Sequence, residues 1–452
     1  MKKINYFSLV FILMFSLTFQ AQTKKWTLDE CVKYAIDNNI SIKQTELDSR
    51  TASIDKKGAV GNFIPSLNSN ASHSWNIGLN QDPTTGLLRN QTTQYSSMGA
   101  GVGVDIYKGM QNQNTLRRAN LSIIAAKYQL TKMQEDVALN VANAFLQVLF
   151  SKENLKVQQD QKAINEKQLL RSEELVKAGS VPRGDLLDIK ATVASDGQRV
   201  VTAENALLIS KLSLSQLLQL KDFYDFDVTD DTSAKDENNI LAQTPIAIYE
   251  KAKEERTELK IAKTNLEIAE KNVAIAKGGL QPTLQGFYNI NTRISYADTF
   301  DFQTGAAQPA ASFGQQFTDN KGQAFGAQLS IPVFNGFAAR NNVERSKVSL
   351  ERSKIAVEQQ ELDLQRNVYT AFTDAKGGLN AYESSLAALD ARQEAYNYAK
   401  EKYAVGMMNS FDFNQSQTLL SIAQSEVLRT KYDYIFKIKI LEFYFGIPIL
   451  KN

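Results

Sequence analysis

Residues able to do bond chemistry are scarce in this 452-residue sequence, which holds one cysteine, Cys31, and one histidine, His73. A single cysteine excludes a disulfide framework, and one thiol with one imidazole is too little for a zinc site or a Cys/His catalytic pair. The sequence also lacks a P-loop and a glycine-rich dinucleotide turn. We therefore expect no catalytic residue, no metal site and no cofactor, and hence a protein that is not an enzyme.

Two carboxylates stand at matching places, because Asp185 follows Gly179 at the same distance as Asp412 follows Gly406. An aspartate at the start of a helix can accept hydrogen bonds from the first free backbone N–H groups. The residue type and its position therefore predict a helix cap at both places.

These matching places belong to a longer internal repeat with an interval of 227 positions. The segment Tyr107-Lys108-Gly109 aligns with Phe334-Asn335-Gly336, and Val176-Lys177-Ala178-Gly179 aligns with Tyr403-Ala404-Val405-Gly406, without a gap between them. Such constant register over a long stretch indicates an internal duplication.

Inside each copy, apolar and small residues recur at steps of three and four, the spacing of a helix packed lengthwise on its neighbours. This pattern predicts long helices over 112–178 and 337–405, each about 100 Å at 1.5 Å per residue. Further helices are expected over 182–220 and 410–446. In the first copy the periodic positions are Leu116, Ala119, Ile123, Ala126, Leu130, Met133, Val137, Val141, Ala144 and Val148.

Two other segments alternate apolar and polar residues with a period of two, which predicts β-hairpins over 64–107 and 282–334. Polar links, 80–94 and 297–321, are expected to join the strands within each hairpin. An outward apolar band with aromatic girdles is typical of outer-membrane barrel strands. Four strands cannot close a barrel, because the smallest have about eight, so the chain must oligomerise. The expected girdle residues are Trp75, Tyr95, Tyr107, Tyr296, Phe325 and Phe334.

The remaining segments complete the expected domain order. Two lysines and an apolar run predict a signal peptide over 1–21. A first repeat, 22–220, begins with helices over 28–61, and a second, 245–447, begins with helices over 245–278. Between them, 221–244 is expected to be an acidic, irregular connector on the outside of the helical body, and 448–452 a tail. Net charge is +2, and mean hydropathy is −0.31. Neither supports nucleic-acid binding or a helical membrane protein.

The repeated helix–turn–helix carries a resemblance to a known family. Its two copies read Val176-Lys177-Ala178-Gly179-Ser180-Val181-Pro182-Arg183-Gly184-Asp185-Leu186 and Tyr403-Ala404-Val405-Gly406-Met407-Met408-Asn409-Ser410-Phe411-Asp412-Phe413. In this order of helices and hairpins, the chain resembles the outer membrane efflux protein family of TolC-like exit ducts. The resemblance implies a mainly α fold, an internally duplicated α-barrel protomer with four β-strands, which trimerises into a twelve-stranded transmembrane barrel.

The resemblance also implies partners and site residues. A homotrimer in outer-membrane lipid would receive substrate from a periplasmic adaptor and an inner-membrane pump of RND or ABC type. The entrance gate and its pore acids would involve Tyr403, Asp185 and Asp412. Gln415 and Met408 replace an acid and an arginine of some relatives, so the locking contacts are not carried over. The adaptor-docking residues at the periplasmic tip would be Gly179, Val181, Asp185, Leu186, Gly406, Met408, Asp412 and Phe413.

Local chemistry agrees with turns at these places, because Gly179 and Gly406 suit the left-handed position that ends a helix. We expect Asp185 and Asp412 to cap the helices that follow.

Two alternatives to an efflux duct stay open. The same duct could serve type I protein secretion, or the chain could be a soluble periplasmic coiled-coil scaffold.

Overall fold

The computed structural model describes residues 25–81, 86–221, 226–230, 239–301 and 303–447. The chain forms two compact units. One, here called the helical unit, comprises the described parts of 1–46, 129–259 and 360–452. The other, the sheet unit, comprises the described parts of 47–128 and 260–359.

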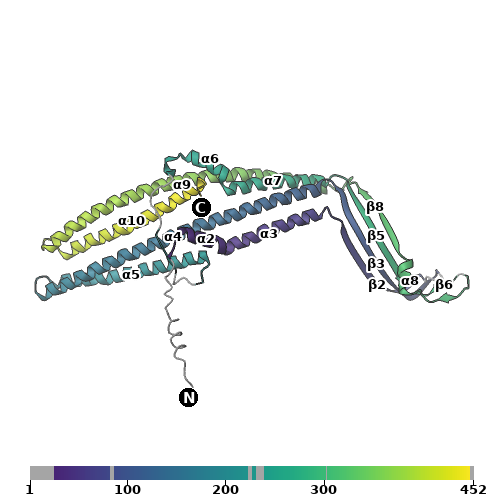
Figure 1. Cartoon of the computed structure of the whole chain (residues 1–452), viewed down its shortest axis with the longest axis horizontal. Coiled ribbons are helices and arrows are strands. Elements are labelled where there is room, and N and C mark those ends of the chain that lie inside the picture. The colour runs from purple at the N-terminus through teal and green to yellow at the C-terminus, as the bar shows by residue number, and fades with distance from the viewer. Residues whose placement is uncertain (1–24, 82–85, 222–225, 231–238, 302, 448–452) are drawn as a thin grey trace, which may run out of the picture. The chain divides into compact units, whose positions relative to one another are not determined.

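The two halves of the chain carry the same order of helices (Figure 1). In the first half these are α2 (Leu28–Asn38), α3 (Ile40–Gly61), α4 (Gln111–Lys177) and α5 (Arg183–Leu218). In the second half they are α6 (Pro245–Glu255), α7 (Thr257–Gly278), α9 (Ala338–Ala404) and α10 (Ser410–Tyr444). The expected class, mainly α with a small set of strands, is confirmed. Heptad-like spacing over so long a run leaves few alternatives to helix.

The sheet unit holds a four-stranded antiparallel sheet made of β2 (Ser66–Gln81), β3 (Leu88–Lys108), β5 (Thr283–Ser295) and β8 (Gly322–Ser330). The strand order is β2-β3-β5-β8, so the two hairpins meet at β3 and β5. Because β2 and β8 are the outer strands, each has one edge that pairs with no other described strand.

The links within the hairpins differ from the expectation. The first link was expected over 80–94, which is wrong, since β3 already pairs with β2 from Leu88, opposite Gln81. Backbone pairing continues past the apolar segment because it needs no apolar side chains. The second link, 297–321, contains β6 (Thr299–Phe300), β7 (Ala307–Gln308) and α8 (Phe313–Asp319), and β8 ends at Ser330 instead of continuing to residue 334.

The acidic connector is not irregular where the structure describes it. Strand β4 (Asp227–Val228) pairs in parallel with β1 (Lys25–Trp26), and a short 3-10 helix, η1 (Ile240–Ala242), precedes α6. Val228 is fully buried, and the Asp227 carboxylate lies 2.8 Å from Lys152 Nζ and 3.3 Å from Lys211 Nζ. The pairing is between segments far apart in sequence, so the local sequence pattern did not predict it.

The expected signal peptide, the C-terminal tail and connector residues 222–225 and 231–238 lie outside the described residues.

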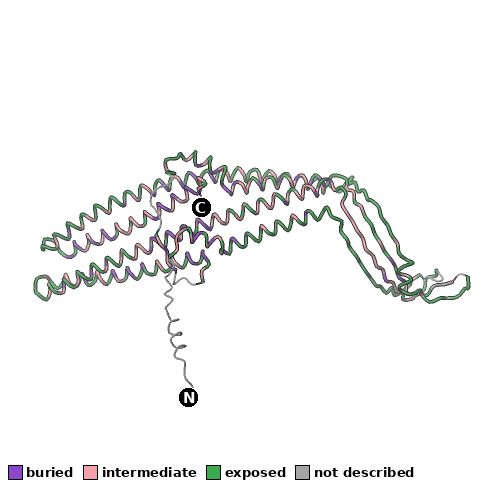
Figure 2. Tube along the Cα trace, in the orientation of Figure 1, coloured by how far each residue is buried: buried purple, intermediate pink, exposed green. Residues whose placement is uncertain are grey.

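The core of the helical unit gathers residues from α2, α4, α5 and α10, together with β4. In Figure 2 buried positions recur along the long helices, whereas nearly all positions of β2 and β8 are exposed. Burying each large apolar side chain contributes about 1.5–3 kcal/mol. None of the described helices combines the length and the apolarity needed to cross a membrane. Central members of this core are Cys31, Val141, Phe145, Leu214, Leu218 and Ile435.

The duplication extends to unusual backbone conformations. Gly109 and Met110, between β3 and α4, have φ angles of 58° and 60°, and their counterparts Gly336 and Phe337 have φ angles of 59° and 65°. Positive φ is costly for residues other than glycine, so two such residues in succession make a sharp, fixed turn. The same turn therefore joins the sheet to both long helices.

Candidate functional site

The first repeated turn, between α4 and α5, is a Schellman motif in the helical unit. Gly179 has a φ of 70°, its N–H donates to Val176 O, and Ser180 N–H donates to Leu175 O at 2.9 Å. These two bonds satisfy carbonyls that the helix end leaves free. Pro182 then precedes the first residue of α5, with no side-chain cap.

The second turn, between α9 and α10, repeats this geometry. Gly406 has a φ of 77°, its N–H donates to Tyr403 O, and Met407 N–H donates to Lys402 O at 2.9 Å. The left-handed conformation expected at both glycines is confirmed. Figure 1 shows both turns at the same end of the helical hairpins.

The aspartates do not cap the following helices, and this expectation is wrong. The N-cap of α10 is Asn409, whose Oδ1 accepts the N–H of Asp412 at 2.8 Å. Asp412 is the third residue of α10 and returns the contact through Oδ2, which accepts from Asn409 Nδ2 at 2.9 Å. Asp185 likewise lies in the first turn of α5, after Pro182. Both carboxylates still interact favourably with the positive end of a helix dipole.

Three aromatic rings stack beside the second turn and hold α9 against α10. The Tyr403 ring lies parallel to that of Phe413, with 4.7 Å between centroids, and Tyr396 stacks on Phe413 at 5.8 Å. Phe413 is 5% exposed, so it packs inside the turn, and its role in adaptor docking stays a prediction. No hydrogen bond joins Tyr403 to Asp185 within one chain among the described residues. Tyr403 is therefore a packing residue of the turn in the isolated chain.

The surface of the turns is more apolar than the sequence motif suggested. Val405, Met407 and Phe411 are 70%, 76% and 68% exposed, and Leu187 on α5 is 58% exposed. Val181, Leu186 and Met408 are part-buried. Exposed apolar residues grouped at one place mark interaction surfaces. The sequence signal for this surface is the run of apolar residues in and beside the turn, because the geometry of the turn itself requires no apolar side chain.

In the sheet unit, the two faces of the sheet differ in chemistry. The apolar face carries Trp75 and Ile77 of β2, both more than half exposed, with Phe325 of β8, which is 84% exposed. His73 also lies on this face, with its ring 4.2 Å from Trp75 and 5.4 Å from Tyr296, and its Nδ1 pairs with Ser96 Oγ at 2.8 Å. No role could be assigned to His73 from the sequence, because two of its partners, Ser96 and Tyr296, lie far from it in the chain.

One expected girdle residue lies on the opposite face. Tyr95 shares its face with Ser97, which pairs in register with Arg293, and the Arg293 guanidinium lies 4.0 Å from the centre of the Tyr95 ring. Tyr95 therefore does not lie in the apolar band. Successive residues of β3 point to opposite faces of the sheet, and Tyr95 falls on the polar face. The membrane role of Trp75, Tyr107, Tyr296, Phe325 and Phe334 stays a prediction.

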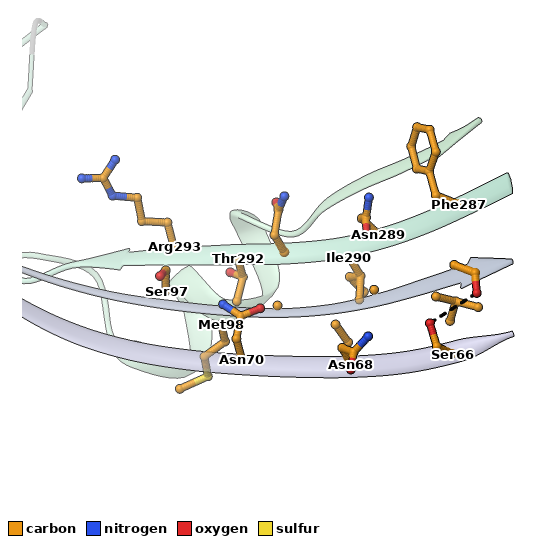
Figure 3. A pocket seen from close by; sticks show the side chains of 16 residues that line it. Ser66, Asn68, Asn70, Ser97, Met98, Phe287, Asn289, Ile290, Thr292 and Arg293 are labelled. Atoms are coloured by element: carbon orange, nitrogen blue, oxygen red, sulfur yellow. Dashed lines mark hydrogen bonds between the residues drawn. The ribbon is translucent and has the colours of Figure 1, made fainter. Parts of the chain in front are cut away.

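The polar face forms a shallow hollow of about 810 Å³ (Figure 3). Asparagine side chains cover its floor, and glycines of the neighbouring strands leave room for them. A Cβ at Gly101 would lie 2.5 Å from Asn289 Oδ1, and one at Gly99 would lie 3.2 Å from Asn70 Oδ1. Among the described residues, no three His, Cys, Asp or Glu side chains come close enough to hold a metal ion.

This combination defines a class of protein. Duplicated long helical hairpins and a sheet with one apolar face are a fold that this chain shares with solved structures of outer-membrane proteins. The chain superposes on the crystal structure of the outer membrane protein VceC from Vibrio cholerae with a TM-score of 0.75, covering 93% of this chain and 96% of that one at 14% identity.

The family follows from the sequence match. The model of the outer membrane efflux protein family matches residues 32–219 and 248–439, and the chain belongs to this family. It is 22% identical to the outer membrane protein TolC of Vibrio cholerae over 69% of this chain and 68% of that protein. It is also 22% identical to the outer membrane efflux protein BepC of Brucella suis over 93% and 85%. The resemblance and the outer-membrane location are confirmed, which overturns the soluble scaffold.

Proposed function

We propose that three copies of this chain form the exit duct of a tripartite efflux system. The duct passively conducts substrates that an inner-membrane pump of RND or ABC type and a periplasmic adaptor deliver to it. The observation that carries this proposal is a four-stranded sheet with an exposed apolar face and two edges that pair with no other described strand. Lipid offers no hydrogen-bond partner to such edges, so a sheet in a membrane must close.

Closure requires further copies of the chain. The free edge of β2 on one copy would pair with the free edge of β8 on the next, and three copies would supply twelve strands. The polar face would line the pore, and the apolar face would meet lipid. A head-to-tail contact of this kind closes into a ring when the rotation between neighbouring copies is a whole fraction of a full turn.

The helices of the sheet unit that adjoin these edges carry matching apolar stripes. Leu47 and Ile54 on α3 are spaced by seven residues, as are Val348 and Ile355 on α9, and all four are more than half exposed. Helix α3 leads into β2, and β8 leads into α9. A spacing of seven is that of helices packed side by side in a coiled coil. The stripes therefore suit a second copy of the chain, in continuity with the proposed strand pairing.

The two turns would form the periplasmic tip, with Gly179, Val181, Leu186, Gly406 and Met408 shaping the adaptor-docking surface. Exposed Val405, Met407 and Phe411 supply the apolar area for that contact. Asp412 and Asp185 would place acids at the entrance. Type I secretion would use the same duct and the same tip. Cross-linking in cells identifies the pump that works with this duct, and the kind of pump distinguishes efflux from type I secretion.

The test is the oligomeric state in detergent, measured by light scattering on the purified protein. Wild type should be a trimer, and Ile54→Glu or Ile355→Glu should give monomers because each places a charge in the stripe. Ile246→Glu, at an exposed position of α6 outside both stripes, is the matched control and should remain trimeric. A wild-type monomer that stays stable without detergent would refute the duct.

The gate has a separate test in planar bilayers. Asp412→Ala should raise the conductance of the channel or reduce its preference for cations, because three carboxylates leave the entrance. Ser416→Ala, one helical turn further along α10, is the control. An unchanged conductance and selectivity would remove Asp412 from the gate while leaving the duct intact.

A further inference from the structure

Charged residues are few on the four long strands. The ranges of β2, β3, β5 and β8 contain only Arg89, Asp105, Lys108 and Arg293. Asp105 and Lys108 lie at the end of β3 that leads into α4, where Lys108 Nζ is 2.8 Å from Asp105 Oδ2. Asp105 also accepts hydrogen bonds from Gln285 and Asn112. The acid of the strands is thus paired with a base at the helical end.

Arg293 lies toward the other end of the sheet and on its polar face. Figure 3 shows its side chain on the same side of β5 as those of Asn289 and Phe287. The guanidinium lies 4.0 Å from the centre of the Tyr95 ring on β3. An aromatic face attracts a cation without neutralising it, so the charge is held in place and remains a charge. Arg89, at the start of β3, lies on the same face of the sheet as Tyr95 and Ser97, since an even number of residues separates them.

The surroundings of Arg293 in the hollow are neutral. Its lining includes asparagines, serines and glycines but no Asp or Glu. Amide side chains bind anions and cations with little preference, so the field in this region comes from the arginine. A cleft lined by one sign of charge concentrates ions of the opposite sign.

We propose that the outer half of the duct selects for anions, through a ring of Arg293 side chains contributed by the three copies. The class of substrate favoured there is anionic solutes, which the arginines attract through their charge. Rings of arginine or lysine select anions in pores by the same field effect. This inference rests on the proposed duct, and it assigns the polar face a selectivity opposite to that of the acids at the tip.

Carboxylates of the neighbouring link also bear on this field. Asp298, Asp301 and Asp319 lie between β5 and β8, beyond the ends of the strands. Asp301 accepts hydrogen bonds from Gln303 N–H and from the Thr304 hydroxyl, so it is tied to its own turn. If these acids controlled the pore instead, Asp298→Asn would change selectivity and Arg293→Gln would not.

The experiment measures the reversal potential of single channels under a KCl gradient in planar bilayers. Arg293→Gln should lower the permeability ratio of chloride to potassium by about twofold at 0.1 M salt. The effect should shrink at 1 M, where the Debye length falls from about 10 Å to about 3 Å. Arg293→Lys keeps the charge and should retain most of the preference. Lys33→Gln removes the charge of an exposed lysine on α2, in the helical unit, and should leave the ratio unchanged.

The outcomes separate this inference from the duct itself. If no channel forms with wild-type protein, the proposed function fails. If channels form and Arg293→Gln has the same reversal potential as wild type, the duct stands and the anion selectivity is overturned. Equal effects of Arg293→Gln and Lys33→Gln would also overturn it, because net charge alone would then explain the change.

Discussion

The guanidinium of Arg256 lies 3.7 Å from the centre of the Phe443 ring, and the arginine is only 4% exposed. Arg256 ends α6, and it contacts Glu135 of α4 at 2.9 Å and Glu258 of α7 at 3.2 Å. The first repeat has Asn39 at the matching break between α2 and α3, where Asn39 Nδ2 donates to Leu217 O. Both repeats thus bury a polar side chain at this break, but only the second buries a charge.

Removing this charge should destabilise the helical unit strongly. Arg256→Met leaves two part-buried carboxylates without their cation, a change that typically costs about 3–5 kcal/mol. Urea unfolding followed by circular dichroism measures the loss. Lys253→Met is the control, since Lys253 pairs with Glu361 at a more exposed site and its loss should cost much less. Equal losses for the two variants would contradict the assigned role of Arg256.

The same cluster predicts a dependence of stability on pH. Desolvation by burial raises the pKa of Glu135 above its usual 4.5, against the opposing effect of Arg256. The folded protein therefore binds this proton more tightly than the unfolded chain does. Its contribution to stability is full below about pH 4.5 and is lost as pH rises through the raised pKa. Glu135→Gln should flatten this part of the stability profile, measured by urea unfolding from pH 4.5 to 7. A profile identical to that of wild type would contradict the linkage.

The duplication supplies a matched pair of glycines at the strand-to-helix turns. Gly109 and Gly336 have nearly equal φ angles, but a Cβ at Gly109 would overlap the carbonyl oxygen of Gly278, whereas one at Gly336 would meet open space. Gly336→Ala should therefore cost only the backbone strain, about 1–2 kcal/mol. Gly109→Ala should cost clearly more, with a lower melting temperature in detergent. If both variants lost the same stability, the close approach to Gly278 would have no energetic weight.

Two residues at the start of α10 have different roles, since Asn409 is the N-cap and Asp412 lies in the first turn. Asn409→Ala should destabilise the start of α10 by about 1 kcal/mol, because the N–H of Asp412 loses its acceptor. Asp412→Ala should cost less, about 0.3–1 kcal/mol, since it removes a dipole interaction and a returned hydrogen bond. Hydrogen exchange of the first turn of α10 measures both. A larger effect of Asp412→Ala would restore the aspartate as the main capping residue.

The fold class could be predicted because its signals are local and repeated. Helix spacing, strand alternation and the two turn glycines each depend on neighbours within a few residues. The starts of helices were less certain, since Asn409 and Asp412 are both residue types that favour caps, and the preceding Schellman turn decides where α10 begins. Burial of Phe413 was missed because its partners Tyr396 and Tyr403 belong to the preceding helix.

The sequence by itself determined the duplicated order of helices and hairpins, the positions of the turns and the family to which the chain belongs. Only the tertiary structure decided that Arg256 is buried, that the connector strand pairs with Lys25–Trp26, and that Tyr95 supports Arg293 on the polar face. These contacts join residues far apart in the chain. A periodic pattern records which face a residue occupies, but the partner across that face depends on how distant segments pack.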